Sequence, residues 1–465
     1  ASLLKRDEEG RYSPKSKIRI IGMPEALFKD AMRAKASWAT KTVGRWLFAF
    51  GQCAVGLQSG GEAAQMMLQL KCEASRDTVL VALDYSNAYS TSDLGASVGA
   101  LERAITLVEL TTEQVLQRLG IHDRSELVAA LDFFLVDVVW LGAHDGEMLA
   151  VIDGVLHRFS KDLGFTQGGL CSMPTFCVLV AVAVLLPLQK QFPDVGLLAI
   201  ADDAVATKIC SQTADIERIA EWTHAYIKLS LGEDHALIHE ITIAYCQLRA
   251  RLGANASKFK VQQAPEHAGT ELDVRRFIHL FPSQTVDGKL RMPKIVNDCF
   301  DFNGVPTGFS TDARAEALMQ KVMVHEERLI ILRDLTPALG RQVAYAYFRH
   351  ALKPSTVFNH VARGAEPTVT CEPLQHAAET QVHTFRAIIN GSERYLRDVQ
   401  FQAAQDQPDV RRCEEACHLG QKRGGLGDRH PVINRAAAFT AKVVDSVGHA
   451  RRTDDVSAIM PHPSE

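Results

Sequence analysis

The sequence predicts an α+β fold, in which a small and mostly antiparallel sheet is backed by helices and followed by an all-helical C-terminal third. Two short apolar runs, residues 78–84 and 196–200, lead into or end at aspartates and are typical of buried strands. Two longer apolar segments, residues 125–142 and 170–188, are typical of buried helices. We therefore expect strands and helices to be combined in the first two thirds of the chain.

Helical periodicity dominates from Thr311 onward. A Ser-Thr-Asp sequence that can cap a helix precedes apolar residues at spacings of four, seven and three, which are Leu318, Val322, Leu329 and Leu332. Later segments such as residues 376–389 continue the helical pattern. We therefore expect two regions, residues 1–310 with the sheet and residues 311–465 as a helical domain.

The composition fits a protein with several hydrophobic cores. With 465 residues, of which 46% are hydrophobic and 23% charged, the chain can bury two or three cores of ordinary domain size. The apolar run at residues 170–188 is long enough to raise the question of a membrane span. Pro174 and Pro187 near its ends, and its position between two polar motifs, favour a buried helix and no membrane partner. Ten scattered cysteines indicate a reducing compartment without a disulfide framework.

Three aspartates lie at the ends of the apolar strands. Asp84 ends the first strand, and Asp202 and Asp203 occupy the turn of an apolar strand pair. A buried carboxylate without a partner is costly, whereas carboxylates that converge from neighbouring strands suit Mg²⁺. Nucleotidyl transfer needs two divalent cations, one at the attacking hydroxyl and one at the triphosphate. The pattern therefore predicts a polymerase site with two Mg²⁺ or Mn²⁺ ions.

A glycine-rich turn, Gln167-Gly168-Gly169, lies between these strands and leads into the long apolar helix. Glycines let the backbone approach a ligand closely. The order of aspartate strand, Gln-Gly-Gly turn with helix, and Asp-Asp hairpin resembles motifs A, B and C of the reverse transcriptase palm. Within that family, the chain resembles the polymerases of non-LTR retrotransposons that insert at fixed genomic sites.

Four further segments carry the resemblance, which extends over roughly residues 5–445. Arg19-Ile20 resembles the family's R-P-I segment, with isoleucine where proline is usual. Residues 50–68 resemble the G-V-x-x-G-x-E-A stretch that precedes motif A. Residues 302–308 resemble the L-G-x-P-I-G segment of the primer grip, and residues 418–431 are similar to the G-G-L-G-L-R segment after the thumb.

This resemblance implies a right-hand polymerase, with fingers and palm in residues 1–310 and an all-helical thumb in residues 311–465. The partners that it implies are an RNA template, a DNA primer and deoxynucleoside triphosphates. The implied metal ligands are Asp84, Asp202 and Asp203, with the backbone carbonyl of Tyr85 as a further ligand. The implied nucleotide-binding residues are Arg19 at the triphosphate, together with Tyr85, Tyr89, Gln167 and Gly168.

Tyr89 bears on the choice of sugar. It follows Asp84 by five residues, where reverse transcriptases carry an aromatic residue that clashes with a 2′-hydroxyl, whereas RNA-dependent RNA polymerases tend to carry a carboxylate. The Gln167-Gly168 turn agrees, because RNA polymerases prefer Ser/Thr-Gly there. Tyr89 therefore favours deoxynucleotides, with a plain core aromatic as the alternative.

Three features depart from the family pattern. The usual Tyr-x-Asp-Asp reads Ile200-Ala201-Asp202-Asp203. The motif D lysine, which donates a proton to pyrophosphate, aligns with His235, and a histidine can donate a proton near neutral pH. Lys228 is the nearest alternative acid. With a net charge of −4, the chain must concentrate basic residues in a cleft or else bind nucleic acid weakly. Basic clusters such as residues 29–35 could form such a cleft, or equally an ordinary solvated helix face.

Two hypotheses follow from these observations. The first is an active RNA-directed DNA polymerase, located in the nucleus if it belongs to a retrotransposon. The second is a domesticated reverse-transcriptase-like protein, which acts as an RNA-binding or structural subunit of a ribonucleoprotein assembly with other proteins, in an organelle such as the mitochondrion. The aspartates, Tyr89 and Gln167 favour the first, because a carboxylate cluster without metal carries a like-charge penalty. The departures, the acidic balance and the lack of a recognised endonuclease segment favour the second.

Overall fold

The computed structural model describes residues 2–4, 18–20, 26–57, 59–85, 88–143, 148–152, 155–159, 164–165, 169–232, 252–254, 258–286, 289–296, 298–348, 352, 358, 361 and 365–390. The chain divides into two compact units. The first comprises residues 1–64, 74–297 and 448–465, and the second comprises residues 65–73 and 298–447. The division after residue 297 falls ahead of the boundary at 310 that the sequence suggested, because Val305 of a preceding hairpin packs into the helical core.

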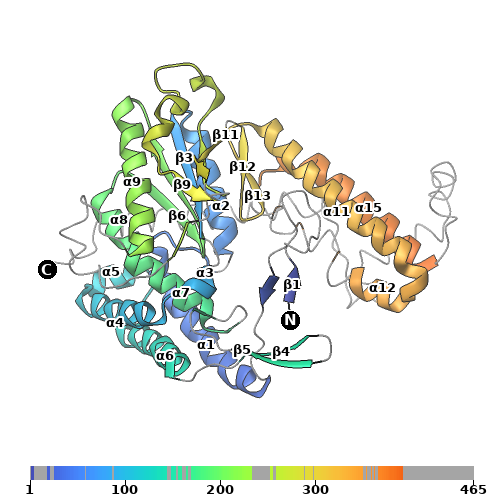
Figure 1. The fold of residues 1–465 in the computed structure, drawn as a ribbon, viewed down its shortest axis with the longest axis horizontal. Coiled ribbons are helices and arrows are strands. Elements are labelled where there is room, and N and C mark those ends of the chain that lie inside the picture. The colour runs from blue at the N-terminus through green and yellow to red at the C-terminus, as the bar shows by residue number, and fades with distance from the viewer. Residues whose placement is uncertain are drawn as a thin grey trace. The chain divides into compact units, whose positions relative to one another are not determined.

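A five-stranded mixed sheet forms the centre of the first unit (Figure 1). Its strands lie in the order β11 (Lys294–Val296), β8 (Lys260–Gln262), β3 (Thr78–Asp84), β7 (Asp203–Ile209) and β6 (Gly196–Ile200). Only β11 and β8 are parallel, and the other neighbours are antiparallel. The α+β class and the strands predicted around the aspartates are confirmed. Because β3 has a partner along each edge, nearly every residue in it is buried, which explains its continuous apolar sequence.

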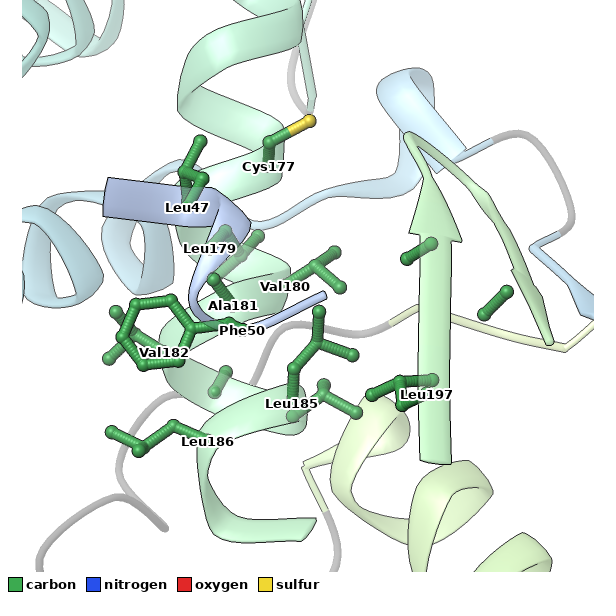
Figure 2. Packing of buried hydrophobic residues seen from close by; sticks show 14 of the residues in the cluster. Leu47, Phe50, Cys177, Leu179, Val180, Ala181, Val182, Leu185, Leu186 and Leu197 are labelled. Carbon is green, nitrogen blue, oxygen red and sulfur yellow. The ribbon is translucent and has the colours of Figure 1, made fainter. Parts of the chain in front are cut away.

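The long apolar segment is confirmed as a helix of the first unit's core. It comprises α7 (Ser172–Val180), a π-helical turn η1 (Ala181–Leu185) and α8 (Leu186–Gln191). Figure 2 shows side chains around this helix, including Leu47 from the end of α1 (Ala26–Phe48), Phe50 from the turn that follows α1, and Leu197 from β6. Among the described residues, this is the one helix long and apolar enough to cross a membrane, and 89% of its most apolar window is buried inside the protein.

The π turn has a local cause in the sequence. The amide of Leu186 donates to the carbonyl of Ala181, five residues earlier, instead of the usual four. Pro187 follows directly and has no amide hydrogen to donate, so the regular ladder is interrupted at this point. The extra residue in the turn rotates the side chains that follow around the helix axis.

Other elements complete the first unit. Helices α1 and α6 pack against each other, as do α4 and α6, and α6 confirms the helix predicted over residues 125–142. The elements of this unit outside the sheet and its core helix are β1 (Ser2–Leu4), β2 (Ile18–Ile20), α1 (Ala26–Phe48), α3 (Ala88–Thr91), α4 (Leu94–Leu110), α5 (Glu113–Arg118), α6 (Arg124–Ala143), β4 (Met148–Ile152), β5 (Val155–Phe159), α9 (Thr213–Leu231), η3 (Pro265–His267), η4 (Val274–Leu280), β9 (Gln284–Val286) and β10 (Lys289–Arg291). Helix α2 (Gly60–Ala74) contributes residues to both units.

The described part of the second unit contains a hairpin and the helices that follow it. Strands β12 (Cys299–Phe302) and β13 (Val305–Gly308) are joined by Asn303-Gly304, and both turn residues have a positive φ, as a tight two-residue hairpin requires. Helices α11 (Thr311–Leu339), α12 (Arg341–Tyr347) and α15 (Pro367–Asn390) follow. Helix α11 begins at the predicted cap, where the Ser310 hydroxyl accepts from the amide of Ala313 at 3.2 Å.

The helical periodicity predicted for this region is also confirmed. The residues that recur along α11 are all buried, and they divide between two hydrophobic clusters shared with α15. One cluster contains Leu318 and Val322, and the other contains Leu329 and Leu332. The pattern therefore marks the face of α11 that packs against α15, in agreement with amphipathic helix packing.

Candidate functional site

The first and last members of the aspartate motif face each other across two strands. Asp84 is the last residue of β3 and Asp203 the first residue of β7, and the two are direct partners in the antiparallel register. The side chain of Asp84 is 4% exposed and that of Asp203 is 34% exposed. The pairing follows from the sequence, because each aspartate stands at the polar end of an apolar strand that must be buried.

A strained two-residue turn carries Asp202. Strand β6 ends at Ile200, which pairs with Asp203, so that Ala201 and Asp202 form the turn of the hairpin. Ala201 has a φ of 55°, a left-handed conformation that costs a non-glycine residue roughly 1–2 kcal/mol. Strain of this kind persists only where the surroundings hold the backbone in place. The residues that hydrogen-bond to Ala201 therefore control the position of Asp202 and Asp203, which follow it in the chain.

Gln52 holds this turn. Its side chain is fully buried, and its amide oxygen accepts from the backbone amide of Ala201 at 2.9 Å while its amide nitrogen donates to the carbonyl of Ala201 at 3.3 Å. The chain around Gln52 is itself fastened to the edge of β6, because the amide of Cys53 donates to the carbonyl of Ala199 at 2.7 Å. Gln52 thus satisfies both backbone groups of the strained residue.

We expect Gln52→Leu to disturb the site as well as the fold. Loss of the side-chain amide leaves the buried amide and carbonyl of Ala201 without their partner, at about 1–3 kcal/mol for each group. The expected results are a lower midpoint of thermal unfolding and a loss of any activity that needs the Asp202-Asp203 turn. The unfolding midpoint and the activity are both measured on purified protein. The activity is measured at a temperature at which the variant is folded.

Gln263→Leu is the matched control for this variant. Gln263 is also buried, and it likewise donates to a carbonyl, that of Leu272, and accepts from a backbone amide, that of Val274. We expect this change to lower stability by a similar amount without an effect on the turn. Equal activity in the two variants would contradict a positioning role for Gln52.

Lys258 supplies a positive charge between the facing carboxylates. Its Nζ lies 3.0 Å from Oδ2 of Asp84 and 3.8 Å from Oδ1 of Asp203. Lys258 lies two residues before β8, which pairs with β3, so the sheet itself brings the lysine to the end of the aspartate strand. Burial opposes the charged form of Lys258, but the contact with Asp84 and the charges of Asp203 and Asp202 outweigh it, and the pKa of Lys258 is raised.

This environment strongly affects the ionisation of Asp203. Burial raises the pKa of Asp203 to about 7, and the nearby charges of Asp84 and Asp202 add to the rise while Lys258 opposes it. Ionisation of Asp203 beside the other two aspartates is therefore unfavourable without a further cation. A buried carboxylate, Asp84, that faces a half-buried one, Asp203, across two strand ends is a site that attracts positive charge.

The oxygen atoms at this site fit a hard divalent cation. The ammonium of Lys258 lies where a cation would touch both Asp84 and Asp203, and carboxylate oxygens are the ligands that Mg²⁺ prefers. In the part of the chain that the structure describes, no three His, Cys, Asp or Glu side chains are grouped so as to hold one metal ion. The structure thus brings Asp84 and Asp203 together, while Asp202 does not complete a three-ligand group with them.

Tyr85 and Tyr89 take different positions. The Tyr85 side chain is buried, its hydroxyl lies 2.9 Å from the Ser230 hydroxyl, and its ring stacks on that of Tyr226. Only its backbone therefore remains for a contact at the site. Tyr89 is half-buried against Phe176 with ring centroids 5.0 Å apart, and its pKa is raised by burial and by the charges of Cys177 and Asp202. Tyr89 is thus close to the Asp-Asp turn.

Several predicted site residues cannot be compared with the structure. Gln167, Gly168 and His235 lie outside the described residues. The backbone of Arg19 belongs to β2 and pairs with Leu3, and nothing is described of its side chain. The nucleotide contacts and the acid predicted at these positions therefore stay predictions.

Comparison with models of known protein families gave no match to this chain, and no curated protein matches it. The geometry at Asp84, Asp203 and Lys258 is therefore what bears on function.

Two residues of this site, Gln52 and Lys258, were not singled out from the sequence. In the reverse transcriptase family the motif D lysine usually ends an L-S-L-N-P-x-K segment, and Lys258 ends an Asn-x-x-Lys sequence of the same spacing that begins at Asn255. That spacing is the sequence signal for Lys258, which lies further along the chain than the segment around His235. For Gln52 the sequence carries no comparable signal, because its role depends on a hydrogen bond to a residue 149 positions away.

Proposed function

We propose that this protein is an RNA-directed DNA polymerase, which transfers nucleotides from deoxynucleoside triphosphates to a DNA primer on an RNA template. The observation that carries the proposal is the direct pairing of Asp84 with Asp203 at the end of two central strands, with the Lys258 ammonium between their carboxylates. A pair of carboxylates from adjacent strands with a basic residue beside them suits the charge changes of phosphoryl transfer.

The chain's own residues have separate roles in this proposal. Asp84 and Asp203 would hold Mg²⁺ or Mn²⁺, with Asp202 as the further ligand that the resemblance implies for a second ion, and the bound ions would supply activation of the primer hydroxyl and neutralisation of the leaving pyrophosphate. Gln52 keeps the Asp-Asp turn in position through Ala201. Lys258 is the candidate to donate a proton to the leaving group, because its Nζ lies at the pair of carboxylates where that group would form.

The fold supports a right-hand polymerase in a general way. The first unit combines the aspartates with a small sheet and packed helices, as expected of a palm with fingers. The second unit is dominated by the paired helices α11 and α15, as expected of a thumb. The hairpin at residues 299–308 matches the segment expected to form the primer grip.

Tyr89 leads to a prediction about sugar selection. Its half-buried ring near Asp202 fits a residue that limits the space at the 2′ position of an incoming nucleotide. We expect Tyr89→Ala to raise ribonucleotide incorporation relative to deoxynucleotide incorporation by about tenfold or more, which corresponds to about 1.4 kcal/mol of lost discrimination. Tyr89→Phe keeps the ring and should keep the preference. An unchanged ratio in Tyr89→Ala would leave Tyr89 as a core residue only.

The direct test of the proposal is primer extension on an RNA template, with Mg²⁺ and with Mn²⁺, by the purified full chain. Incorporation of deoxynucleotides that depends on the template sequence is the expected result. Absence of extension with both metals and several primer–template pairs would refute polymerase activity.

One observation favours the second candidate function, an inactive relative that serves as an RNA-binding or structural subunit. The like-charge penalty between Asp84 and Asp203 was an argument for a bound metal, but Lys258 relieves part of that penalty without one. The aspartates can therefore be retained in a protein that no longer polymerises. RNA binding without extension in the assay above would support this candidate.

A further inference from the structure

A pocket of about 1080 Å³ opens on the first unit beside α1. Its lining residues do not include Asp84, Asp202 or Asp203. Its walls come from α1, from residues 56–57, from the turn between α5 and α6 at residues 119–122, and from Leu170. This volume lies at the upper end of the range for small-molecule sites. The pocket therefore has room for more than one phosphate group.

Positive side chains line this pocket in a row. Arg33, Lys41 and Arg45 belong to one ridge of α1, with Ser37 in the same i, i+4 series. At 1.5 Å per residue, neighbouring positions of the ridge are about 6 Å apart and the row is about 18 Å long. Among the described residues that line the pocket, none is acidic, and His122 stands on the wall formed by the α5–α6 turn.

These cations are available to a ligand. Arg33, Lys41 and Arg45 are all exposed. The contact of Arg33 with Asp30 is a weak one, at 3.8 Å between side chains that are 65% and 73% exposed. Arg45 donates through one terminal nitrogen to the carbonyl of Gly120 at 3.0 Å, which keeps its guanidinium at the pocket and leaves its other donors for a ligand.

The rest of the lining is apolar or uncharged. Leu57 and Leu170, which are half-buried, contribute apolar surface beside the row of cations, and the buried Phe48 and Leu119 also belong to the lining. The pocket wall also has free space at Gly120, which has a φ of 73°, because a Cβ built there would meet no atom within 4 Å. A surface that combines a row of cations with apolar patches matches a polymer of phosphates and flat, weakly polar bases.

We propose that this pocket binds a single strand of nucleic acid, with successive phosphates along Arg33, Lys41 and Arg45 and with bases against the apolar wall. Three positive charges spread over about 18 Å of one helix suit a chain of phosphates better than a single phosphate group. The site also answers how a chain of net charge −4 binds nucleic acid, because its basic residues are concentrated on one ridge. Binding here needs neither the aspartates nor a metal, so it applies to an active polymerase and to an RNA-binding subunit alike.

The test measures binding in EDTA by fluorescence anisotropy, with labelled oligouridine and oligothymidine of about 12 nucleotides. The variant is Arg33→Gln with Lys41→Gln in the full chain. Lost phosphate contacts should weaken binding to both strands and reduce the slope of log K against log salt concentration by about 0.7 per contact, or about 1.4 in total. Uridine monophosphate should bind far more weakly than the oligomer.

The control variant is Lys35→Gln, on the same helix, which removes one positive charge where the double variant removes two. Lys35 does not line the pocket, and its ammonium lies over the Phe133 ring at 5.3 Å. The control should keep the wild-type affinity and salt slope. An equal slope in the double variant and the wild type, or uridine monophosphate that binds as tightly as the oligomer, would overturn the proposal.

The result of this binding test does not depend on whether the protein extends a primer. The binding assay contains no primer, triphosphate or metal, and Asp203→Asn should bind both strands as the wild type does. Extension without a change of affinity in the double variant would refute the pocket and leave the polymerase in place. Affinity that depends on the row, in a protein that fails to extend a primer, would support the pocket and refute the polymerase.

Discussion

Asp203→Asn is expected to abolish primer extension while the fold is kept. The change removes a charge and almost no volume at a position paired directly with Asp84. A carboxylate that helps to stabilise transferring phosphates contributes several kcal/mol, so the rate should fall by about 10³-fold or more. The measurement is single-turnover extension with Mg²⁺, together with far-UV circular dichroism of the variant. Extension at the wild-type rate would refute the proposed role of the Asp84–Asp203 pair.

The same variant has a second expected effect, on stability without metal. The pKa of Asp203 is about 7 in the folded protein and about 3.9 in an unfolded chain. Between these values the folded state keeps a proton that the unfolded state has lost, so the free energy of unfolding should fall as pH rises from about 4 to about 7. Asp203→Asn has no group to titrate and should remove this part of the pH dependence.

Thermal unfolding in EDTA across that pH range checks this effect. Mg²⁺ added at pH 8 should raise the unfolding midpoint of the wild type more than that of Asp203→Asn, because only the wild type has the full set of carboxylates. Identical pH profiles for the two proteins would mean that Asp203 is not held in the environment described above.

Lys258→Ala is expected to have the second large effect. If Lys258 donates a proton to the leaving pyrophosphate, its loss should lower the turnover of extension by about 10²–10⁴-fold, the usual contribution of a general acid. Lys258→Arg should restore little of this turnover, because a guanidinium keeps its proton at any accessible pH. Pre-steady-state kinetics with saturating nucleotide separate this loss from weaker nucleotide binding.

A measurement that does not require activity accompanies this variant. Without the ammonium, Asp84 and Asp203 face each other as like charges, so Lys258→Ala should lower the unfolding midpoint in EDTA at pH 8. Mg²⁺ should restore more stability to Lys258→Ala than to the wild type, because the ion replaces the missing positive charge. An equal response of both proteins to Mg²⁺ would contradict a cation site at this pair.

His235→Ala is the control that decides between the two candidate acids. If Lys258 is the acid, His235→Ala should extend at close to the wild-type rate, and its pH profile should not change. If His235 is the acid, turnover should fall as pH rises through about 6 to 8, and His235→Lys should move that fall to higher pH. Loss of turnover in His235→Ala with none in Lys258→Ala would assign the acid to His235.

Several elements of the fold could be predicted from sequence, because each depends on a pattern of residues that are close together in the chain. The apolar run of β3 and the helical spacing of Leu318 and Val322 both record which side chains are buried, and both are confirmed. The aspartate ends of β3 and β7 were predictable for the same reason, since a carboxylate in an apolar run marks the point where burial ends. Local pattern thus determined the element types and placed two of the three aspartates together.

What only the tertiary structure decided depends on residues far apart in the chain. The left-handed Ala201 persists because Gln52 hydrogen-bonds both of its backbone groups from 149 positions away. Lys258 reaches Asp84 because β8 pairs with β3, and strand pairing of this kind depends on the whole sheet. The sequence alone therefore determined the strands, the helices and the carboxylates of the candidate site. The tertiary structure decided which side chains hold and neutralise those carboxylates, because hydrogen bonds and ion pairs act through space and leave no periodic signal along the chain.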